Sequence, residues 1–187
     1  AIHRHTLEVL HAAGKRVIYV NLSGSAIALE PETKSCDAIV QGWYGGQNGG
    51  IAIADVLFGD YNPAGRLPVT FYKNDAQLPD YEDYNMSAGH TYRYMKERPL
   101  FPFGYGLSYS KFRIGRAHKS GQLTANASAV EGEVELTIPV KNLSHYDGEE
   151  VVQLYVAKKG EKEGPCYALR GFKRVAVPAL SKQTVTF

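Results

Sequence analysis

Two short apolar runs near the start of the chain constrain its fold more than any other feature. Residues 16–20 (Arg-Val-Ile-Tyr-Val) and 37–40 (Asp-Ala-Ile-Val) are of strand length and nearly continuous in apolar character. Such runs are typical of parallel strands that are buried on both faces of a sheet. Helical spacing at 6–13 precedes the first run, and a helix is expected at 51–58, ending at Gly59. The order of elements predicts βαβ units around a mostly parallel sheet.

A third strand is expected at 67–71, after the second helix. Gly14 is expected to end the first helix, and Asn48 to cap the second. Two or three strands cannot close a sheet that is buried on both faces, because such a sheet needs more neighbours to cover it. We therefore expect this region to be the C-terminal part of an α/β domain.

The last third of the chain changes to a period-two pattern. Val134, Leu136 and Ile138 alternate with Glu135 and Thr137, as in a strand with one buried face. Short strands separated by turn residues at this spacing predict a β-sandwich, which is incomplete because a seven-strand sandwich would need about two more strands. The expected strands lie near 112–118, 133–141, 149–157, 168–176 and 183–187.

The region between these two patterns, residues 73–110, is rich in Pro, Gly and Tyr. A loop this long is usually functional or tightly packed, and its aromatic residues favour packing. Just before it, we expect the guanidinium of Arg66 to pair with Asp60 or Asp55 and so fix the preceding turn.

Composition excludes several classes of function. The 187 residues carry 21 Lys and Arg against 19 Asp and Glu, so a net charge of +2 argues against a nucleic-acid binder. No apolar run is long enough to span a membrane. Cys36 and Cys166 are too few for a disulfide framework, and His3, His5 and His11 lack metal-ligand spacing. We expect neither a metal nor an organic cofactor.

Longer strings carry more specific information. Residues 54–71 (ADVLFGDYNPAGRLPVTF), 78–81 (LPDY), 91–94 (TYRY) and 100–109 (LFPFGYGLSY) follow one another in this order. Together with 42–50 (GWYGGQNGG) they closely resemble the C-terminal half of family 3 glycoside hydrolases, the β-glucosidase and β-xylosidase family. The resemblance covers essentially the whole chain.

The glycine-rich loop contains one departure from the family pattern. Gly45 stands where many members carry Pro, and we expect it to loosen the turn. The run 45–50 could cradle an anion on its backbone N–H groups, but it lacks the Lys-Ser/Thr of a P-loop. Close packing of strand and helix is the favoured role of these glycines.

The resemblance implies a fold class and a domain order. It implies an α/β fold followed by an all-β fold, with residues 1–72 as the C-terminal part of an α/β sandwich domain. Residues 73–110 would be the interdomain linker. Residues 111–187 would be an incomplete, C-terminally truncated fibronectin type III-like β-sandwich.

The resemblance also implies a function. Retaining glycosidases need two carboxylates about 5 to 5.5 Å apart. In this family the nucleophile is an Asp of a barrel domain, and the acid/base is usually a Glu of the α/β domain. Neither motif occurs here, so we expect no catalytic residue in the chain and no activity in isolation. The whole enzyme would be an exo-acting, retaining β-glucosidase or β-xylosidase of plant polysaccharide breakdown. Its partner would be an oligosaccharide, and the family implies a periplasmic or extracellular location.

Three residues are candidates for secondary contacts with substrate. Trp43 follows a strand at its C-terminal end, where ligands gather in open α/β sheets. Tyr92 and Arg93 lie in the region that, in the family, passes near the domain interface. Packing is the competing role of each residue.

Two alternatives remain. Asp80, Glu82 and Asp83 could supply a local carboxylate pair, but carboxylates at this spacing in a Pro-bounded loop are usually solvated. The last third could also be a noncatalytic carbohydrate-binding or interaction module. A row of exposed aromatic residues on one sheet face would favour that function.

Overall fold

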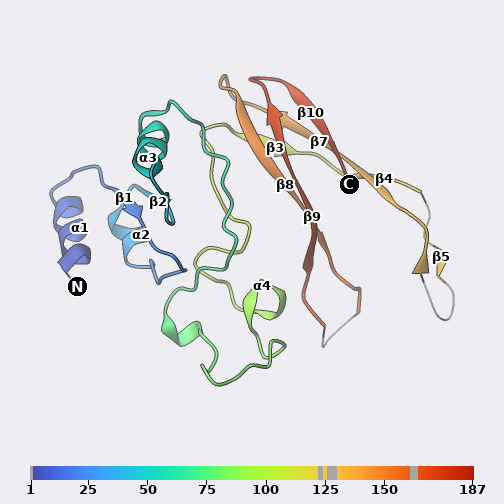
Figure 1. Ribbon diagram of the computed structural model, residues 1–187, viewed down its shortest axis with the longest axis horizontal. Coiled ribbons are helices and arrows are strands. Elements are labelled where there is room, and N and C mark those ends of the chain that lie inside the picture. Colours follow the sequence, from blue (N-terminus) through green and yellow to red (C-terminus); the bar gives the residue numbers. More distant parts are fainter. Residues whose placement is uncertain (1, 122–123, 126–129, 161–163) are drawn as a thin grey trace. The chain divides into compact units, whose positions relative to one another are not determined.

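The computed structural model describes residues 2–121, 124–125, 130–160 and 164–187 (Figure 1). The chain divides into two compact units, and each is described by itself. The first unit comprises Ala1–Tyr61, Leu67–Tyr105 and Lys158–Cys166, and the second comprises Asn62–Arg66, Gly106–Ala157 and Tyr167–Phe187.

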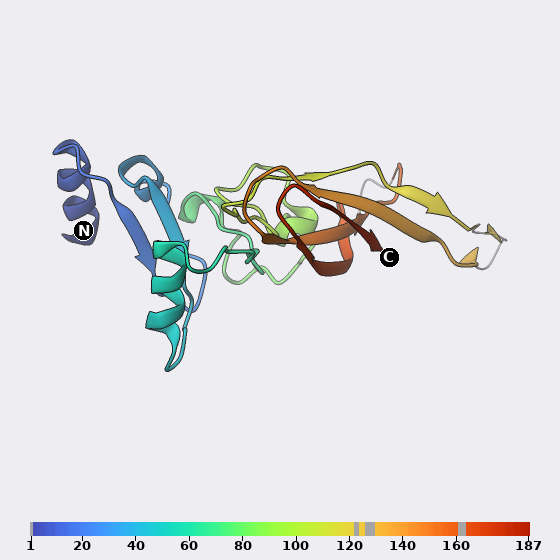
Figure 2. The same ribbon diagram turned by 90° about the horizontal axis from the view of Figure 1, so that it is seen from above.

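The first unit is an α/β unit, as the apolar runs predict. Its two strands pair in parallel with Ile18 opposite Ala38, and Figure 2 shows them running in the same direction. Gly59 ends the second long helix in the left-handed conformation (φ 87°), and its N–H donates to the Asp55 carbonyl at 3.1 Å. The elements are α1 (Ile2–Ala12), β1 (Ile18–Asn21), α2 (Glu32–Ser35), β2 (Ala38–Gln41), α3 (Gly49–Phe58), the 3-10 turn η1 (Asp75–Gln77) and α4 (Thr91–Tyr94).

Two expectations for this unit are wrong in detail. No strand forms at 67–71, where a single bridge pairs Phe71 with Phe101. Pro68 lies inside that run and has no N–H to donate to a strand ladder. Asn48 does occupy the N-cap position of α3, but its side chain makes no capping hydrogen bond.

The helices of the first unit leave apolar side chains in water. Helix α1 buries no residue, and α3 buries Gly49 alone although its sequence is almost entirely apolar. Ile51 is 64% exposed and Phe58 is 84% exposed. A helix that is apolar on nearly all sides is normally buried, so these faces suit contact with further protein.

The second unit is all-β, and its pairings are antiparallel. One sheet has the order β10-β7-β3 with β4 also on β7, and β8 pairs with β9 in another. The expected strand positions are confirmed, except that two strands, β3 and β4, replace the single one expected at 112–118, and the pairing of β5 with β6 has no counterpart in the expected set. The strands are β3 (Phe112–Ile114), β4 (His118–Ser120), β5 (Thr124–Ala125), β6 (Val130–Glu131), β7 (Glu135–Asn142), β8 (Gly148–Val156), β9 (Ala168–Val177) and β10 (Lys182–Thr186).

The core of this unit joins the two larger sheets. Val140 and Val185 come from the first sheet, and Val152 and Val177 come from the second; all four are almost fully buried. Their neighbours in sequence point the other way, since side chains alternate along a strand. The core therefore identifies which face of β10-β7-β3 is directed outward.

No helix among the described residues is both long and apolar enough to cross a membrane.

Candidate functional site

A buried polar network lies where β1 and β2 end. Register places Asn21 opposite Gln41, and the Asn21 Nδ2 donates to Gln41 Oε1 at 2.5 Å and to Ser23 Oγ at 2.9 Å. The Tyr19 hydroxyl donates to Asn21 Oδ1 at 3.2 Å. Asn21 is 4% exposed, so these bonds satisfy groups that would otherwise be costly to bury. The network fixes the two loops that follow the strands.

Close backbone packing holds the same loops together. A Cβ on Gly24 would lie 2.6 Å from Tyr44 Cε2, and one on Gly42 would lie 2.7 Å from Leu22 Cδ2. A Cβ on Gly45 would lie 2.6 Å from the Cα of Gly49. The turn at Gly45 is therefore tight, in contrast to the looser turn expected, because its backbone approaches the start of α3 directly.

Trp43 leaves β2 in an unusual conformation. Its φ of 52° lies in the left-handed region, which bulky residues rarely occupy. The half-buried ring lies edge-on to Phe71, with the two ring centroids 6.1 Å apart. Phe71 in turn lies 6.3 Å from Phe101, which stacks on Tyr105 at 5.2 Å. Trp43 is thus the first member of a continuous aromatic row.

Tyr92 and Arg93 belong to a second aromatic group. The Tyr92 ring stacks on Phe103 with centroids 4.3 Å apart and an interplanar angle of 16°. The exposed Arg93 guanidinium lies 6.0 Å from the Tyr92 centroid. A hydrogen bond with the Tyr92 side chain is the main cause that raises the pKa of Arg93. The backbone N–H of Cys166 donates to the Arg93 carbonyl at 2.6 Å. This bond anchors helix α4, to which Tyr92 and Arg93 belong.

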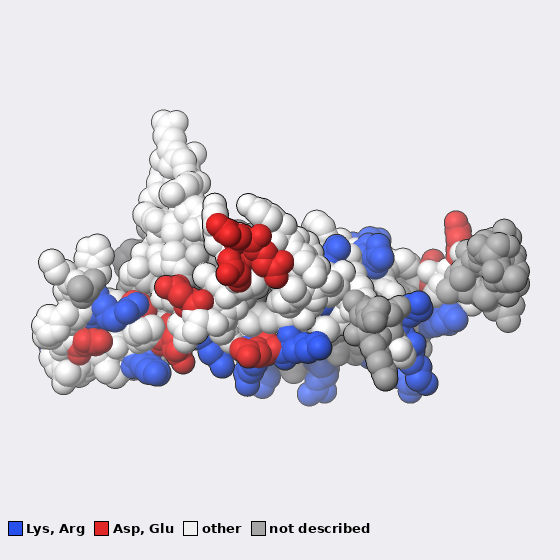
Figure 3. All heavy atoms as spheres, turned by 90° about the horizontal axis from the view of Figure 1, so that it is seen from below, with Lys and Arg blue, Asp and Glu red and all other residues white. Residues whose placement is uncertain are grey.

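The carboxylates at 80–83 cap turns. Asp80 Oδ1 accepts from the backbone N–H of Glu82 at 2.9 Å, and Asp83 Oδ1 accepts from Asn85 N–H at 2.8 Å. The two Asp side chains thus serve exposed local turns, which favours the solvated interpretation. Figure 3 shows acidic and basic atoms interspersed, so neither charge sign covers the face that it draws.

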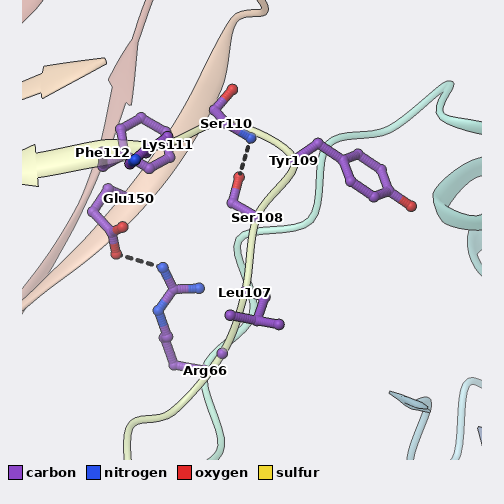
Figure 4. Close-up of a pocket in the computed structure, with 9 residues that line it drawn as sticks. Arg66, Leu107, Ser108, Tyr109, Ser110, Lys111, Phe112 and Glu150 are labelled. Atoms are coloured by element: carbon purple, nitrogen blue, oxygen red, sulfur yellow. Dashed lines mark hydrogen bonds and ion pairs between the residues drawn. The ribbon is translucent and has the colours of Figure 1, made fainter. Parts of the chain in front are cut away.

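The second unit contains a cleft of about 280 Å³ that the sequence does not indicate (Figure 4). Arg66 Nη2 lies 2.5 Å from Glu150 Oε1, and both side chains are 12% exposed. This pair replaces the expected pairing of Arg66 with Asp60 or Asp55, because the fold brings β8 beside the turn. The lining residues are Arg66, Gly106, Leu107, Ser108, Tyr109, Ser110, Lys111, Phe112 and Glu150.

Nothing in the described ranges groups three or more His, Cys, Asp or Glu side chains into a site that could hold a metal ion. The groups described around Asn21, Trp43 and Tyr92 in the first unit are aromatic and hydrogen-bonding side chains. Such groups suit contact with a polyhydroxylated ligand or with another part of a protein.

Two protein families match the sequence. Residues 2–109 match the glycosyl hydrolase family 3 C-terminal domain, and residues 150–187 match a fibronectin type III-like domain. A xylan 1,4-β-xylosidase of Xylanibacter ruminicola is 56% identical over 179 residues, which is 95% of this chain and 20% of that protein. A periplasmic β-glucosidase of Salmonella typhimurium is 35% identical over 196 residues, 98% of this chain and 25% of that protein.

Solved structures have the same fold. A β-D-glucoside glucohydrolase from Trichoderma reesei superposes with a TM-score of 0.82 at 26% identity, over 98% of this chain and 29% of that chain. β-Glucosidase 3B from Thermotoga neapolitana gives a TM-score of 0.83 at 26% identity, over 99% of this chain and 28% of that chain. The chain thus spans between a fifth and a third of the proteins that it matches. It belongs to glycosyl hydrolase family 3, as the C-terminal domain of that family followed by a fibronectin type III-like domain.

Proposed function

We propose that this chain is the C-terminal part of a retaining exo-β-glycosidase that releases xylose or glucose from oligosaccharides of plant polysaccharides. The observation that carries the proposal is the 56% identity to a xylan 1,4-β-xylosidase over 95% of the chain. That relative makes β-xylosides the favoured substrate class, and the periplasmic β-glucosidase at 35% identity makes β-glucosides the second.

The catalytic carboxylates are proposed to lie outside the chain. Asp80 and Asp83, two of the three clustered carboxylates, accept hydrogen bonds from exposed backbone turns. A retaining mechanism needs one carboxyl group with a raised pKa close to a second that stays ionised. These exposed turns leave both carboxylates in contact with water and occupied by backbone N–H groups. The local residues therefore do not suit the two catalytic roles.

Residues 1–72 are proposed to be the end of an α/β sandwich domain, 73–110 a linker, and 111–187 a truncated fibronectin type III-like β-sandwich. The apolar surface of α3, with Phe58 84% exposed, supports the first part of this division. That surface would be covered by the remaining part of the α/β domain. Periplasmic or secreted placement is proposed from the relative's printed name.

Trp43, Tyr92 and Arg93 are proposed to contact substrate at the edge of the active site. Trp43 is supported by its strained left-handed backbone, since such strain gathers at functional positions. Arg93 is supported by its exposed guanidinium, which is held beside the Tyr92 ring. An aromatic face and a fixed cation are suited to binding sugar rings and their hydroxyl groups.

The test uses the complete open reading frame that contains this sequence. We expect it to hydrolyse p-nitrophenyl β-D-xyloside or glucoside with retention, and the 187-residue chain alone to be inactive. Trp43→Ala and Arg93→Ala in the complete enzyme should raise KM. Tyr81→Ala, at a 92% exposed position, is the matched control and should leave KM unchanged. Turnover by the isolated chain would place catalytic groups within it and contradict the proposal.

A further inference from the structure

Three cations stand side by side across one sheet of the second unit. Lys141 of β7 lies directly opposite Lys182 of β10 on one side and Arg113 of β3 on the other. All three side chains are exposed. Directly opposite residues of antiparallel strands point to the same side, with Cα atoms about 4.5 to 5.5 Å apart. The row of three therefore spans about 10 Å on one face.

This arrangement costs stability. Like charges directly opposite one another in a sheet repel, typically by a few tenths of a kcal/mol to about 1 kcal/mol for each pair. Among the described residues, none of the three cations has an ion-pair partner. Pairing with an anionic ligand would relieve this repulsion.

Hydroxyl-bearing residues continue the same face along the strands. Thr184 lies opposite Pro139, and Thr186 and His118 both lie opposite Thr137. Val140 and Val185, which alternate with these positions, are buried in the core, so the row of cations points away from it. We call Arg113, Lys141, Lys182, Thr137, Thr184, Thr186 and His118 the cation face.

We propose that the cation face binds a carboxylate-bearing polysaccharide, such as a chain that contains uronate residues. The three cations would pair with carboxylates, and the threonine hydroxyls and the imidazole would hydrogen-bond to sugar hydroxyls. The choice of a saccharide among anionic polymers rests on the proposed glycosidase function. The face would hold the complete enzyme on charged regions of its polysaccharide.

The composition of the cation face disfavours two other polyanions. The residues that define it include no Phe, Tyr or Trp, the large aromatic side chains on which successive nucleic acid bases stack best. Its apolar member in register, Pro139, is half-buried, and stable anchoring on a membrane normally takes two signals. Sugar hydroxyls, in contrast, match the threonine and histidine groups beside the cations.

The test measures binding of oligogalacturonate to the 187-residue chain by titration calorimetry, with circular dichroism to check the fold of every variant. The wild-type chain should bind oligogalacturonate, more weakly at higher salt, and should bind a neutral xylo-oligosaccharide less tightly. Lys141→Gln with Lys182→Gln should weaken binding about 25-fold, taking about fivefold for each cation near an anionic surface.

Lys119→Gln is the matched control. Lys119 is an exposed cation of β4 in the same sheet, but its register partner is Leu136, one position out of phase with the cation face. This variant should bind as tightly as the wild-type chain. Equal weakening by Lys119→Gln, equal binding of the neutral saccharide, or no binding at all would overturn the proposal.

Two further measurements separate the alternatives. Tighter binding to phosphatidylserine vesicles than to oligogalacturonate, lost in the double variant, would assign the face to lipid and overturn the saccharide. Turnover of a p-nitrophenyl xyloside by the complete enzyme tests the proposed function alone, because that small substrate carries no carboxylate. Failure of one proposal is therefore distinguishable from failure of the other.

Discussion

Arg66 and Glu150 are 84 positions apart in the sequence and form an ion pair of 2.5 Å within the second unit. Arg66 Nη1 also donates to the carbonyls of Ala64 and Gly65, at 3.2 and 3.0 Å. Glu150 Oε1 accepts a second bond from the N–H of Val151 at 2.8 Å. The pair thus ties the turn before residue 67 to strand β8.

Replacing Glu150 by Gln should destabilise the chain, by about 2 to 4 kcal/mol, because the largely buried Arg66 loses its counter-charge. The unfolding midpoint in urea measures the change. Glu149→Gln is the matched control, since its partner Arg174 is 51% exposed and surface pairs contribute about 0 to 1 kcal/mol. Equal losses of unfolding free energy in the two variants would mean that the buried Arg66–Glu150 pair stabilises the chain no more than a surface pair does.

Gly106→Ala should be strongly destabilising. The added Cβ would lie 2.1 Å from the carbonyl oxygen of Gly65, and a backbone atom cannot rotate away as a side chain can. Gly50→Ala, in helix α3 with nothing within 4 Å, should instead stabilise the chain by up to about 1 kcal/mol. Thermal unfolding of both variants tests these opposite changes in stability. An unchanged unfolding temperature for Gly106→Ala would show that the backbone segments at Gly65 and Gly106 can move apart.

Asn142→Ala should cost about 2 to 4 kcal/mol, because it leaves buried polar groups without partners. The side chain is fully buried, and its Nδ2 donates to the carbonyls of Tyr146 at 2.7 Å and Val177 at 3.0 Å. Its Oδ1 accepts from the N–H of Ser144 at 2.9 Å. Asn85→Ala, at an exposed turn, is the comparison. Denaturant unfolding should show a loss of about 0.5 kcal/mol for this variant.

The thiol of Cys36 should react slowly. Burial is the main cause that raises its pKa, and the nearby Glu32 and Asp37 charges raise it further. A raised pKa means less thiolate at any given pH, so alkylation should lag behind that of a free cysteine and accelerate as pH rises. The Cys166→Ser variant carries Cys36 alone, and its iodoacetamide rate against pH gives the measurement. A rate equal to that of free cysteine at pH 8 would contradict the prediction.

Local pattern was sufficient for much of the fold. Period-two alternation located β7 and β8, and the recurrence of short strands between turn residues located β9 and β10, each within a residue or two. Glycine chemistry placed the end of α3 at Gly59. The same reasoning failed at 67–71, where β-prone residues surround Pro68 and the segment pairs at Phe71 alone.

The contacts of the candidate site were harder to predict, since they depend on residues far apart in sequence. Aspartates near Arg66 were plausible partners by distance along the chain, whereas the fold supplies Glu150. The position of Trp43 after a strand makes it a candidate, but its positive φ and its contact with Phe71 have no local signature in the sequence. Arg113, Lys141 and Lys182 form a row only because of the register between their strands. The alternation of apolar and polar residues does not specify that register.

The exposed apolar surface of α3 affects the self-association of this chain in solution. Phe58 and Ile51 face water over most of their area, and apolar patches of that kind adhere to one another when molecules meet. The 187-residue chain should therefore self-associate as its concentration rises, and Phe58→Ser should keep it dispersed in light scattering. Association through this helix would indicate that its apolar surface is normally covered by other protein.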